Sequence, residues 1–195
     1  MTPASKVTQK LLLVLRSLPL KDTYMLMPVA GFSDVQLLEY WVPLDAAGLL
    51  RYRFNDSSSP CAEEALMYQR QSQHIYSKTD CFVVVETLSS KIVAEVAVSD
   101  MTGKAGQFHF SVLDSNSTSL NNYLGTAISD FVLNSMTSRG GPYVNTLFGL
   151  TPVLNRAACF LVLRSGFKKM GILPSGCLFA TEICDAMVTT KLRKI

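Results

Sequence analysis

The chain has 195 residues and a mass of 21.4 kDa, enough for one sizeable hydrophobic core and short for two typical domains. Hydrophobic residues make up 48% and charged residues 17%, so the composition excludes a disordered chain. The net charge is only +3, and we interpret the one tight basic cluster, Lys191, Arg193 and Lys194, as a solvated tail. We therefore expect a compact, soluble protein with no nucleic-acid partner.

The cysteine pattern indicates reduced thiols, because the number of cysteines is odd and no two of them form a C-x-x-C pair. The five are Cys61, Cys81, Cys159, Cys177 and Cys184. No histidines stand at metal-ligand spacing, so we expect a cytoplasmic protein without metal. The apolar run from Leu11 to Leu15 is too short for a signal peptide, and no stretch approaches the roughly 20 apolar residues of a membrane helix. No membrane contact is expected.

The first 80 residues give the weakest signal, because prolines interrupt every candidate helix. A helix is expected around residues 33–40, with Ser33 as its cap. Its predicted apolar face is formed by Val35, Leu38 and Trp41. Residues 55–60 (NDSSSP) indicate a loop, and residues 62–74 a polar helix.

From Cys81 the pattern changes to strands. Residues 81–87 (CFVVVET) and 92–99 (IVAEVAVS) are rich in β-branched residues and predict a β-hairpin. Residues 107–113 (QFHFSVL) predict a third strand, and because side chains alternate along a strand, His109, Ser111 and Leu113 share one face.

A helix capped within residues 117–119 follows, and its apolar stripe should lie on the sheet. The stripe consists of Leu124, Ile128, Phe131, Val132 and Ser135. Residues 143–150 predict another strand, and residues 155–165 a short, almost wholly apolar helix that Gly166 ends. Two last strands are expected at 168–172 and 178–183, around a turn at Pro174, Ser175 and Gly176. This order predicts an α/β (α+β) protein, a mixed sheet with helices packed on it.

Two motifs within Cys81 to Ile183 resemble the GNAT superfamily of N-acetyltransferases. Residues 155–168 (NRAACFLVLRSGFK) are similar to its N-x-x-A…G-F segment, through Asn155, Ala158, Gly166 and Phe167. Residues 122–127 (NYLGTA) are similar to its pyrophosphate loop, Q/R-x-x-G-x-G/A. The resemblance implies a mixed, mostly antiparallel sheet, flanked by helices and splayed between the fourth and fifth strands. It also implies one domain over residues 1–195, with an acceptor-side region at 1–79 and a cofactor-binding core at 80–185.

The reaction that the resemblance implies is transfer of an acyl group, usually acetyl, from acetyl-CoA to an amine. Helix N-terminal amides would hold the diphosphate of coenzyme A, with Gly125 allowing close approach. The backbone near Leu113 would supply an oxyanion donor, and Asn155 would bind the pantetheine arm. The implied cofactor-binding residues are Leu113, Asn122, Tyr123, Leu124, Gly125, Thr126, Ala127, Asn155 and Ala158. A second interpretation stays open, in which Gly125 and Ala127 only let the helix pack closely.

The chain departs from the superfamily pattern at the general acid. The usual tyrosine, seven residues after the motif asparagine, is Val162, which cannot protonate a departing thiolate. Asn122 stands where glutamine or arginine is customary, and no Lys or Arg occurs between Lys104 and Arg139. Backbone amides and the helix dipole would therefore have to stabilise the diphosphate alone.

The candidate catalytic residues are His109, Glu95 and Tyr123. Histidine suits a general base at neutral pH, although a lone histidine is more often a structural, hydrogen-bonded residue, which is the second interpretation of His109. Glu95 can act through a bound water or be a solvent-facing strand residue. Tyr123 and Tyr143 are candidate acids, and Cys159 is interpreted as a core residue rather than a nucleophile.

Residues 147–160 (LFGLTPVLNRAACF) and 166–176 (GFKKMGILPSG) resemble, within the superfamily, GNAT-like proteins of tailed bacteriophages. This implies an alternative function: a catalytically weak or silent GNAT-fold protein of virion assembly or DNA delivery, with virion proteins as partners in the host cytoplasm. A phosphate-binding module without transfer chemistry is a third alternative. The sequence specifies neither the amine acceptor, small molecule or protein, nor the oligomeric state.

Overall fold

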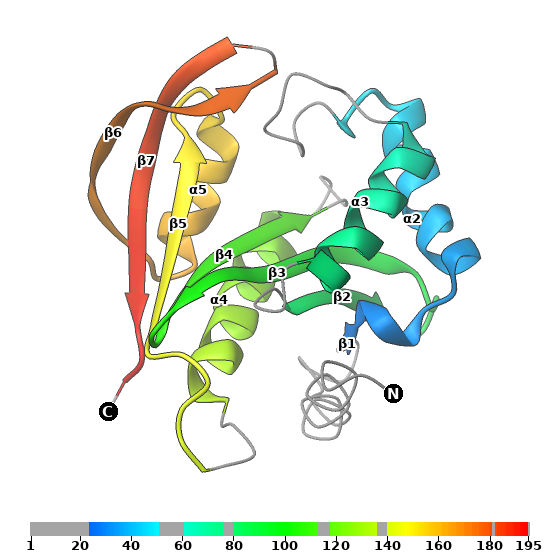
Figure 1. Cartoon of the computed structure of the whole chain (residues 1–195), viewed down its shortest axis with the longest axis horizontal. Helices are drawn as coiled ribbons and strands as arrows, with labels where there is room; N and C mark the ends of the chain where they lie inside the picture. Colours follow the sequence, from blue (N-terminus) through cyan, green and yellow to red (C-terminus); the bar gives the residue numbers. More distant parts are fainter. Residues whose placement is uncertain are drawn as a thin grey trace.

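A computed structural model of the protein describes residues 24–50, 61–75, 80–112, 118–135, 140–180 and 182–194. In these ranges seven strands form one sheet in the order β1-β2-β3-β4-β5-β7-β6 (Figure 1). Neighbouring strands are antiparallel, except that β4 and β5 run parallel. The predicted fold class, a mixed and mostly antiparallel sheet flanked by helices, is confirmed.

The antiparallel half of the sheet contains β1 (Tyr24–Pro28), β2 (Asp80–Glu86), β3 (Ile92–Thr102) and β4 (Ala105–Val112). Helices cover both faces of this half, so β2 has an unbroken buried run instead of an alternating pattern. The three predicted strands are confirmed. β1, for which no element was predicted, pairs with β2 over its whole length.

One face of the sheet is covered by α2 (Asp34–Ala46) and α3 (Ala62–Ile75) (Figure 1). Ser33 begins α2 as predicted, because its hydroxyl accepts the Gln36 N–H and the Gln36 side chain accepts the Ser33 N–H. The predicted apolar face was partly wrong: Val35 is 68% exposed. The buried residues of α2 are Leu37, Tyr40 and Trp41.

The opposite face is covered by α4 (Thr118–Asn134), whose buried residues include Leu124, Ile128 and Val132, in agreement with the predicted stripe. α5 (Arg156–Arg164) follows β5 (Thr146–Pro152). The helix is confirmed, but none of its residues is fully buried, and Phe160 is 55% exposed. No helix in the described ranges has the length and apolar character that a membrane crossing requires.

The last two strands, β6 (Lys168–Phe179) and β7 (Glu182–Leu192), form a long hairpin. The turn predicted between them was misplaced. Pro174, Ser175 and Gly176 lie inside β6, where the register with β7 shifts between Leu173 and Cys177. Ser175 adopts a φ of 51°, and its N–H donates to the Asp185 carboxylate at 3.1 Å. The extra residues are therefore absorbed by an irregularity in β6, and the chain reverses after Phe179 instead.

The interpretation of the C-terminal basic cluster as a solvated tail was wrong for Lys191. Lys191 lies within β7, opposite Leu147 of β5, and is only 9% exposed. It is not part of a solvated tail.

The strands β4 and β5 separate soon after they meet. They pair only where Ala105, Gly106 and Gln107 face Thr146, Leu147 and Phe148. Beyond these pairs the two strands diverge (Figure 1). The predicted splay between the fourth and fifth strands is confirmed.

Candidate active site

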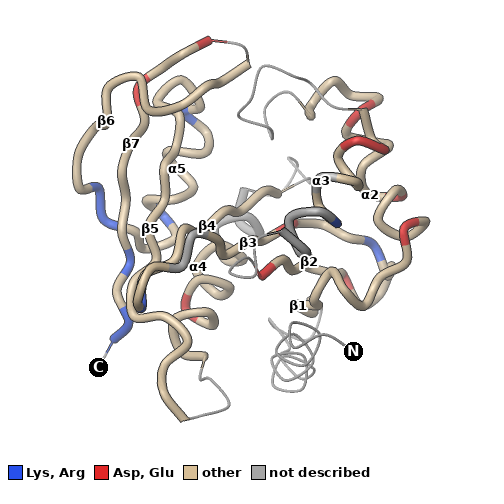
Figure 2. Tube along the Cα trace, in the orientation of Figure 1, with Lys and Arg blue, Asp and Glu red and all other residues tan. Residues whose placement is uncertain are grey.

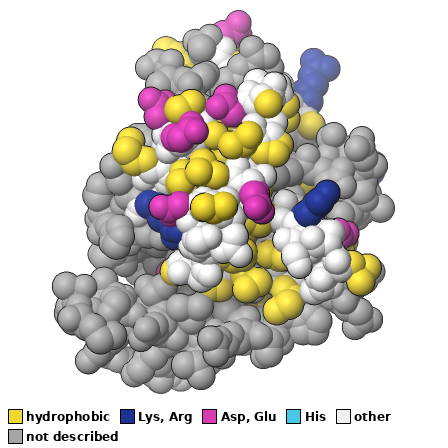
Figure 3. All heavy atoms as spheres, turned by 90° about the vertical axis from the view of Figure 1, so that its right-hand side faces the viewer, with side chains coloured by type: hydrophobic (Ala, Val, Ile, Leu, Met, Phe, Trp, Pro, Cys, Tyr) yellow, Lys and Arg dark blue, Asp and Glu magenta, His cyan; other side chains and the backbone are white. Residues whose placement is uncertain are grey.

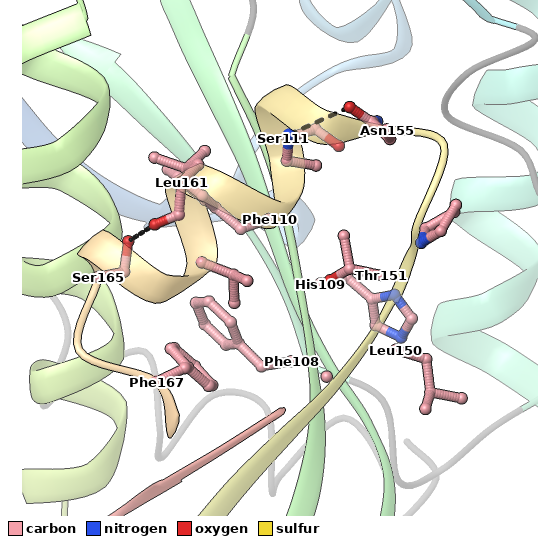
Figure 4. Close-up of a pocket in the computed structure, with 14 residues that line it drawn as sticks. Phe108, His109, Phe110, Ser111, Leu150, Thr151, Asn155, Leu161, Ser165 and Phe167 are labelled. Carbon is pink, nitrogen blue, oxygen red and sulfur yellow. Dashed lines mark hydrogen bonds between the residues drawn. The ribbon is translucent and has the colours of Figure 1, made fainter. Parts of the chain in front are cut away.

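A cleft occupies the space where β4 and β5 separate, and α5 closes one side of it (Figure 4). β4 contributes residues 108–111 and β5 contributes residues 149–152. The segment that carries α5 contributes Asn155, Ala158, Leu161, Val162, Ser165 and Phe167. We call this the β4–β5 cleft. All but one of the residues that carry the N-x-x-A…G-F motif line it, and the exception is Gly166.

Asn155 fixes the N-terminal end of α5 at the cleft. Its side-chain oxygen accepts the Ala158 N–H at 3.1 Å, which satisfies one of the donors that a helix start leaves unpaired. The side-chain NH₂ takes no part in this cap. Asn155 can therefore both orient the helix and offer a donor to a ligand in the cleft.

The inner end of the cleft is apolar. Phe108 stacks with Phe110 and with Phe167, at ring-centroid distances of 6.3 and 5.7 Å. Val162 lines the cleft beside them and packs against the core. The position that holds a tyrosine in the superfamily pattern therefore faces the cleft, and here it carries no proton donor.

His109 also lines the cleft, beside Leu150 and Thr151 (Figure 4). Its Nε2 lies 3.0 Å from the Ser99 hydroxyl of the neighbouring strand. This hydrogen bond orients the ring without removing it from the cleft. The two interpretations of His109 are thus compatible, because the residue is hydrogen-bonded and faces the candidate site.

Glu95 is not a solvent-facing strand residue, since it is only 3% exposed. It accepts a hydrogen bond from the Gln69 side chain at 3.1 Å, and Gln69 in turn accepts the Trp41 indole N–H at 3.1 Å. Glu95 is paired in register with Ser111, which lines the cleft, but does not line it itself. A direct role with a substrate would need a bridging water or hydroxyl.

The two candidate tyrosines lie outside the lining of the cleft. Tyr123 packs against the core on the α4 side. Tyr143 donates a hydrogen bond to the Asp80 carboxylate, and burial together with that carboxylate raises the pKa of its phenol far above the ordinary value. Neither phenol is placed to protonate a group held in the cleft.

Residues 122–127, which were predicted to form a phosphate-binding loop at a helix start, lie inside α4. α4 begins at Thr118, so the backbone N–H groups of Tyr123 to Ala127 lie inside the helix, where they bond to carbonyls one turn earlier. The N–H groups without intrahelical partners belong to the first turn. Leu113 and the side chain of Asn122 lie outside the described part of the chain.

Gly125 has a packing role in this structure. A Cβ added to it would lie 2.1 Å from the Ser165 hydroxyl oxygen. This close approach supports the second interpretation of Gly125: the nearest neighbour is Ser165 at the end of α5, and the Phe110 ring of β4 lies 3.6 Å from the same Cβ position. Thr126 and Ala127 are half-buried in the same helix, and Leu124 is fully buried in the core.

Other chemistry finds little support in the described residues. No group of three His, Cys, Asp or Glu side chains there could hold a metal ion. All five cysteines carry free thiols. Burial raises the pKa of the Cys159 thiol, and its sulfur donates to the Pro152 carbonyl, so it is a weak nucleophile.

Sequence reasoning missed two polar residues of the cleft, Ser111 and Thr151. No motif pointed to them. The only signal was strand alternation, which places Ser111 on the same face as His109.

No family model matches the sequence, and a search among curated proteins finds no relative. The structure is similar to several solved acetyltransferases. Spermidine N-acetyltransferase from Vibrio cholerae, in complex with CoA and spermine, has a TM-score of 0.68 and 14% identity, over 89% of this chain and 97% of that one. Ribosomal-protein-S5-alanine acetyltransferase from Vibrio fischeri has a TM-score of 0.65 and 15% identity, over 89% and 94%.

A third similar structure, Mycobacterium smegmatis RimJ with CoA-disulfide, has a TM-score of 0.67 and 11% identity, over 87% of this chain and 81% of that one. At these identities the likeness establishes the fold alone. The narrower resemblance to proteins of tailed bacteriophages stays a prediction. From its sheet order, its splayed parallel pair and these structural neighbours, the chain has the fold of the GNAT acetyltransferases.

Proposed function

We propose that the protein is an acyl-CoA-dependent N-acyltransferase, with acetyl-CoA as donor, and that the cofactor's pantetheine arm lies in the β4–β5 cleft. The observation that carries this proposal is the separation of β4 and β5 after three paired positions, with the Asn155-capped end of α5 at the opening. Strand edges that diverge leave backbone groups free to hydrogen-bond the amides of an extended ligand. Similarity to acetyltransferases solved with CoA supports coenzyme A as the cofactor.

In the proposed reaction the amine nitrogen attacks the thioester carbonyl, and the C–S bond then breaks to release the thiolate of coenzyme A. In this proposal the oxyanion is stabilised by the backbone N–H groups of β4 that face the cleft beyond Gln107, since β5 no longer pairs with the strand there. His109 accepts the proton that the amine loses. With Val162 at the acid position, the thiolate takes its proton from solvent.

The charge distribution favours a cationic acceptor. Acidic side chains predominate on the elements at the right of Figure 2, where α2 and α3 lie, and the space-filling view of that side shows them among apolar groups (Figure 3). The described acids of α2, α3, β2 and β3 are Asp34, Glu39, Asp45, Glu63, Glu64, Asp80, Glu86 and Glu95, against Arg70 of α3 and Lys91 in the turn between β2 and β3. Such a field attracts cations to this side of the molecule. A polyamine or a basic peptide is therefore the expected acceptor class.

A turnover assay tests the proposal. Purified protein is incubated with acetyl-CoA and either spermidine, a lysine-rich peptide or an acidic peptide that carries a free α-amine, and thiol release is followed. We expect release with the cationic amines, and less of it at high salt because screening weakens the attraction. Cofactor binding without release for any amine would favour the catalytically silent alternative, to which the absence of a tyrosine among the described lining residues also points.

A further inference from the structure

Lys191 is a buried cation with a complete set of partners. Its ammonium nitrogen lies 2.7 Å from the Asp130 carboxylate, 2.8 Å from the Ser129 hydroxyl and 2.8 Å from the Ser165 carbonyl. A lysine ammonium has three donors, and these acceptors use all of them. Because burying a cation is costly unless it is paired, the Lys191 ammonium strongly favours the one arrangement in which all three acceptors are in place.

The partners of Lys191 belong to two different helices. Ser129 and Asp130 lie on α4, whereas the Ser165 carbonyl stands at the C-terminal end of α5. A cation at this end of a helix also interacts favourably with the helix dipole. Lys191 therefore ties α4 and α5 to β7 at one point.

The two helices also contact each other at this point. The Ser129 hydroxyl donates to the Gly125 carbonyl at 2.6 Å, and Gly125 in turn leaves room for the Ser165 side chain. The contacts form a closed circuit through Lys191, Ser129, Gly125 and Ser165. We call these four residues, with Asp130, the Lys191 junction.

The Lys191 junction borders the β4–β5 cleft. Ser165 and Phe167 both line the cleft, and the Lys191 nitrogen lies 5.8 Å from the centre of the Phe167 ring. Between them, Gly166 adopts a φ of 86°, and a Cβ there would lie 3.5 Å from the Lys191 nitrogen. A displacement of the Lys191 side chain would therefore change its contacts with Ser165 and Phe167, which both line the cleft.

We infer that Lys191 is a positioning residue of the cofactor cleft: by holding the C-terminal end of α5 against α4, it sets the wall formed by Ser165 and Phe167. The expected effect of Lys191 on cofactor binding rests on the proposed function. The expected effect of Lys191 on the contact between α4 and α5 is independent of that function. Because Lys191 does not line the cleft, its loss weakens cofactor binding without removing a reacting group.

Lys191→Met tests the inference, because it keeps the stem of the side chain and leaves no buried unpaired charge. Asp130 is partly exposed and can be solvated in this variant. The matched control is Lys169→Met, on the exposed strand β6. Two properties are measured: the Kd for coenzyme A by calorimetry, and hydrogen exchange of the ligand-free protein at the amides of Ser165, Gly166 and Phe167.

In Lys191→Met we expect these three amides to exchange faster and the Kd to rise roughly tenfold or more, because small misplacements of lining groups are costly. KM for acetyl-CoA should rise with it, while kcat at saturating cofactor and its pH profile stay as in the wild type. Lys169→Met should change none of these quantities. If Lys191→Met does not fold, Ser129→Ala, which removes one partner of the lysine, should shift exchange and Kd in the same direction by less.

Two results would overturn the inference. Unchanged exchange at residues 165–167 would show that Lys191 does not hold the junction, and faster exchange with an unchanged Kd would show that the junction does not position the cofactor. A wild-type protein that binds no coenzyme A would instead overturn the proposed function. The exchange data alone would then decide whether Lys191 holds α5.

Discussion

Ser165 occupies the space that a side chain on Gly125 would fill, because a Cβ built on Gly125 would lie 2.1 Å from the Ser165 hydroxyl oxygen. Gly125 of α4 thus contacts the C-cap residue of α5. This contact explains the glycine of the NYLGTA segment, and the segment's amides are engaged within α4.

Gly125→Ala should therefore lower the free energy of unfolding by roughly 1–3 kcal/mol, as overpacking in a tight contact usually does. Urea denaturation measures this loss. Gly31→Ala is the control, since a Cβ there meets nothing within 4 Å. Adding Ser165→Gly should recover part of the loss, and coenzyme A binding should return with stability. Persistent loss of binding in a stable double variant, when Ser165→Gly alone still binds coenzyme A, would mean that Gly125 contacts the cofactor after all.

Much of the sheet was predictable because its strands carry strong local signals. β2 and β3 each contain three valines, and α4 shows a regular apolar stripe. β1 has five residues, too few for a recognisable period, and becomes a strand only by pairing with β2. Pro174 looked like a turn residue, but the edge of a sheet tolerates proline and an irregular register.

The candidate site was predictable only where a motif determines geometry. Asn155 and Ala158 were placed correctly at the start of α5 because capping follows from local sequence. Lys191 was misinterpreted because burial of a lysine depends on partners more than 60 positions away along the chain, as the Ser129 contact shows. No local pattern reports such a contact.

Replacing His109 tests the proposed base. His109→Gln keeps most of the polar shape and removes a group that titrates near neutral pH, so kcat/KM should fall by roughly 10²–10⁴. Turnover is measured between pH 6 and pH 9, with a thermal melt as the folding control. Ser99→Ala, which removes only the partner of the ring, should have a smaller effect. Wild-type turnover in folded His109→Gln would leave Glu95, acting through water, as the candidate base.

Val162→Tyr tests whether the missing acid limits the rate. If departure of the thiolate is slow, a phenol at this lining position should raise kcat, because it can return a proton to the sulfur. The larger ring should also cost roughly 1–3 kcal/mol of stability. Val162→Phe adds the same bulk without the hydroxyl and is the matched control. Equal rates in the tyrosine and phenylalanine variants would show that protonation of the thiolate is not limiting.

Asp80 gives a prediction for pH dependence. Burial raises the pKa of its carboxyl, and the hydrogen bond from Tyr143 offsets only part of that rise. The unfolded chain therefore loses this proton at a lower pH than the folded protein does. The contribution of Asp80 to stability should fall as pH rises from the unfolded pKa, about 3.9, through the raised folded pKa, and then level off.

Asp80→Asn keeps an acceptor for the Tyr143 hydroxyl and removes the ionisation. Relative to the wild type, this variant should gain stability over that pH interval and keep the gain at neutral pH. Urea unfolding between pH 3.5 and pH 7 measures the difference. A difference that stays constant with pH would show that Asp80 titrates as it does in the unfolded chain.

Direct titration of the protein with coenzyme A tests the central claim, that the β4–β5 cleft holds the cofactor. Ala158 lines the cleft, and its neighbour Ala157 is exposed on the same helix and does not line it. Ala158→Trp should fill the cleft and abolish binding, whereas Ala157→Trp should bind as the wild type does. Absence of binding by the wild type at millimolar coenzyme A, or unimpaired binding by a folded Ala158→Trp variant, would contradict the account.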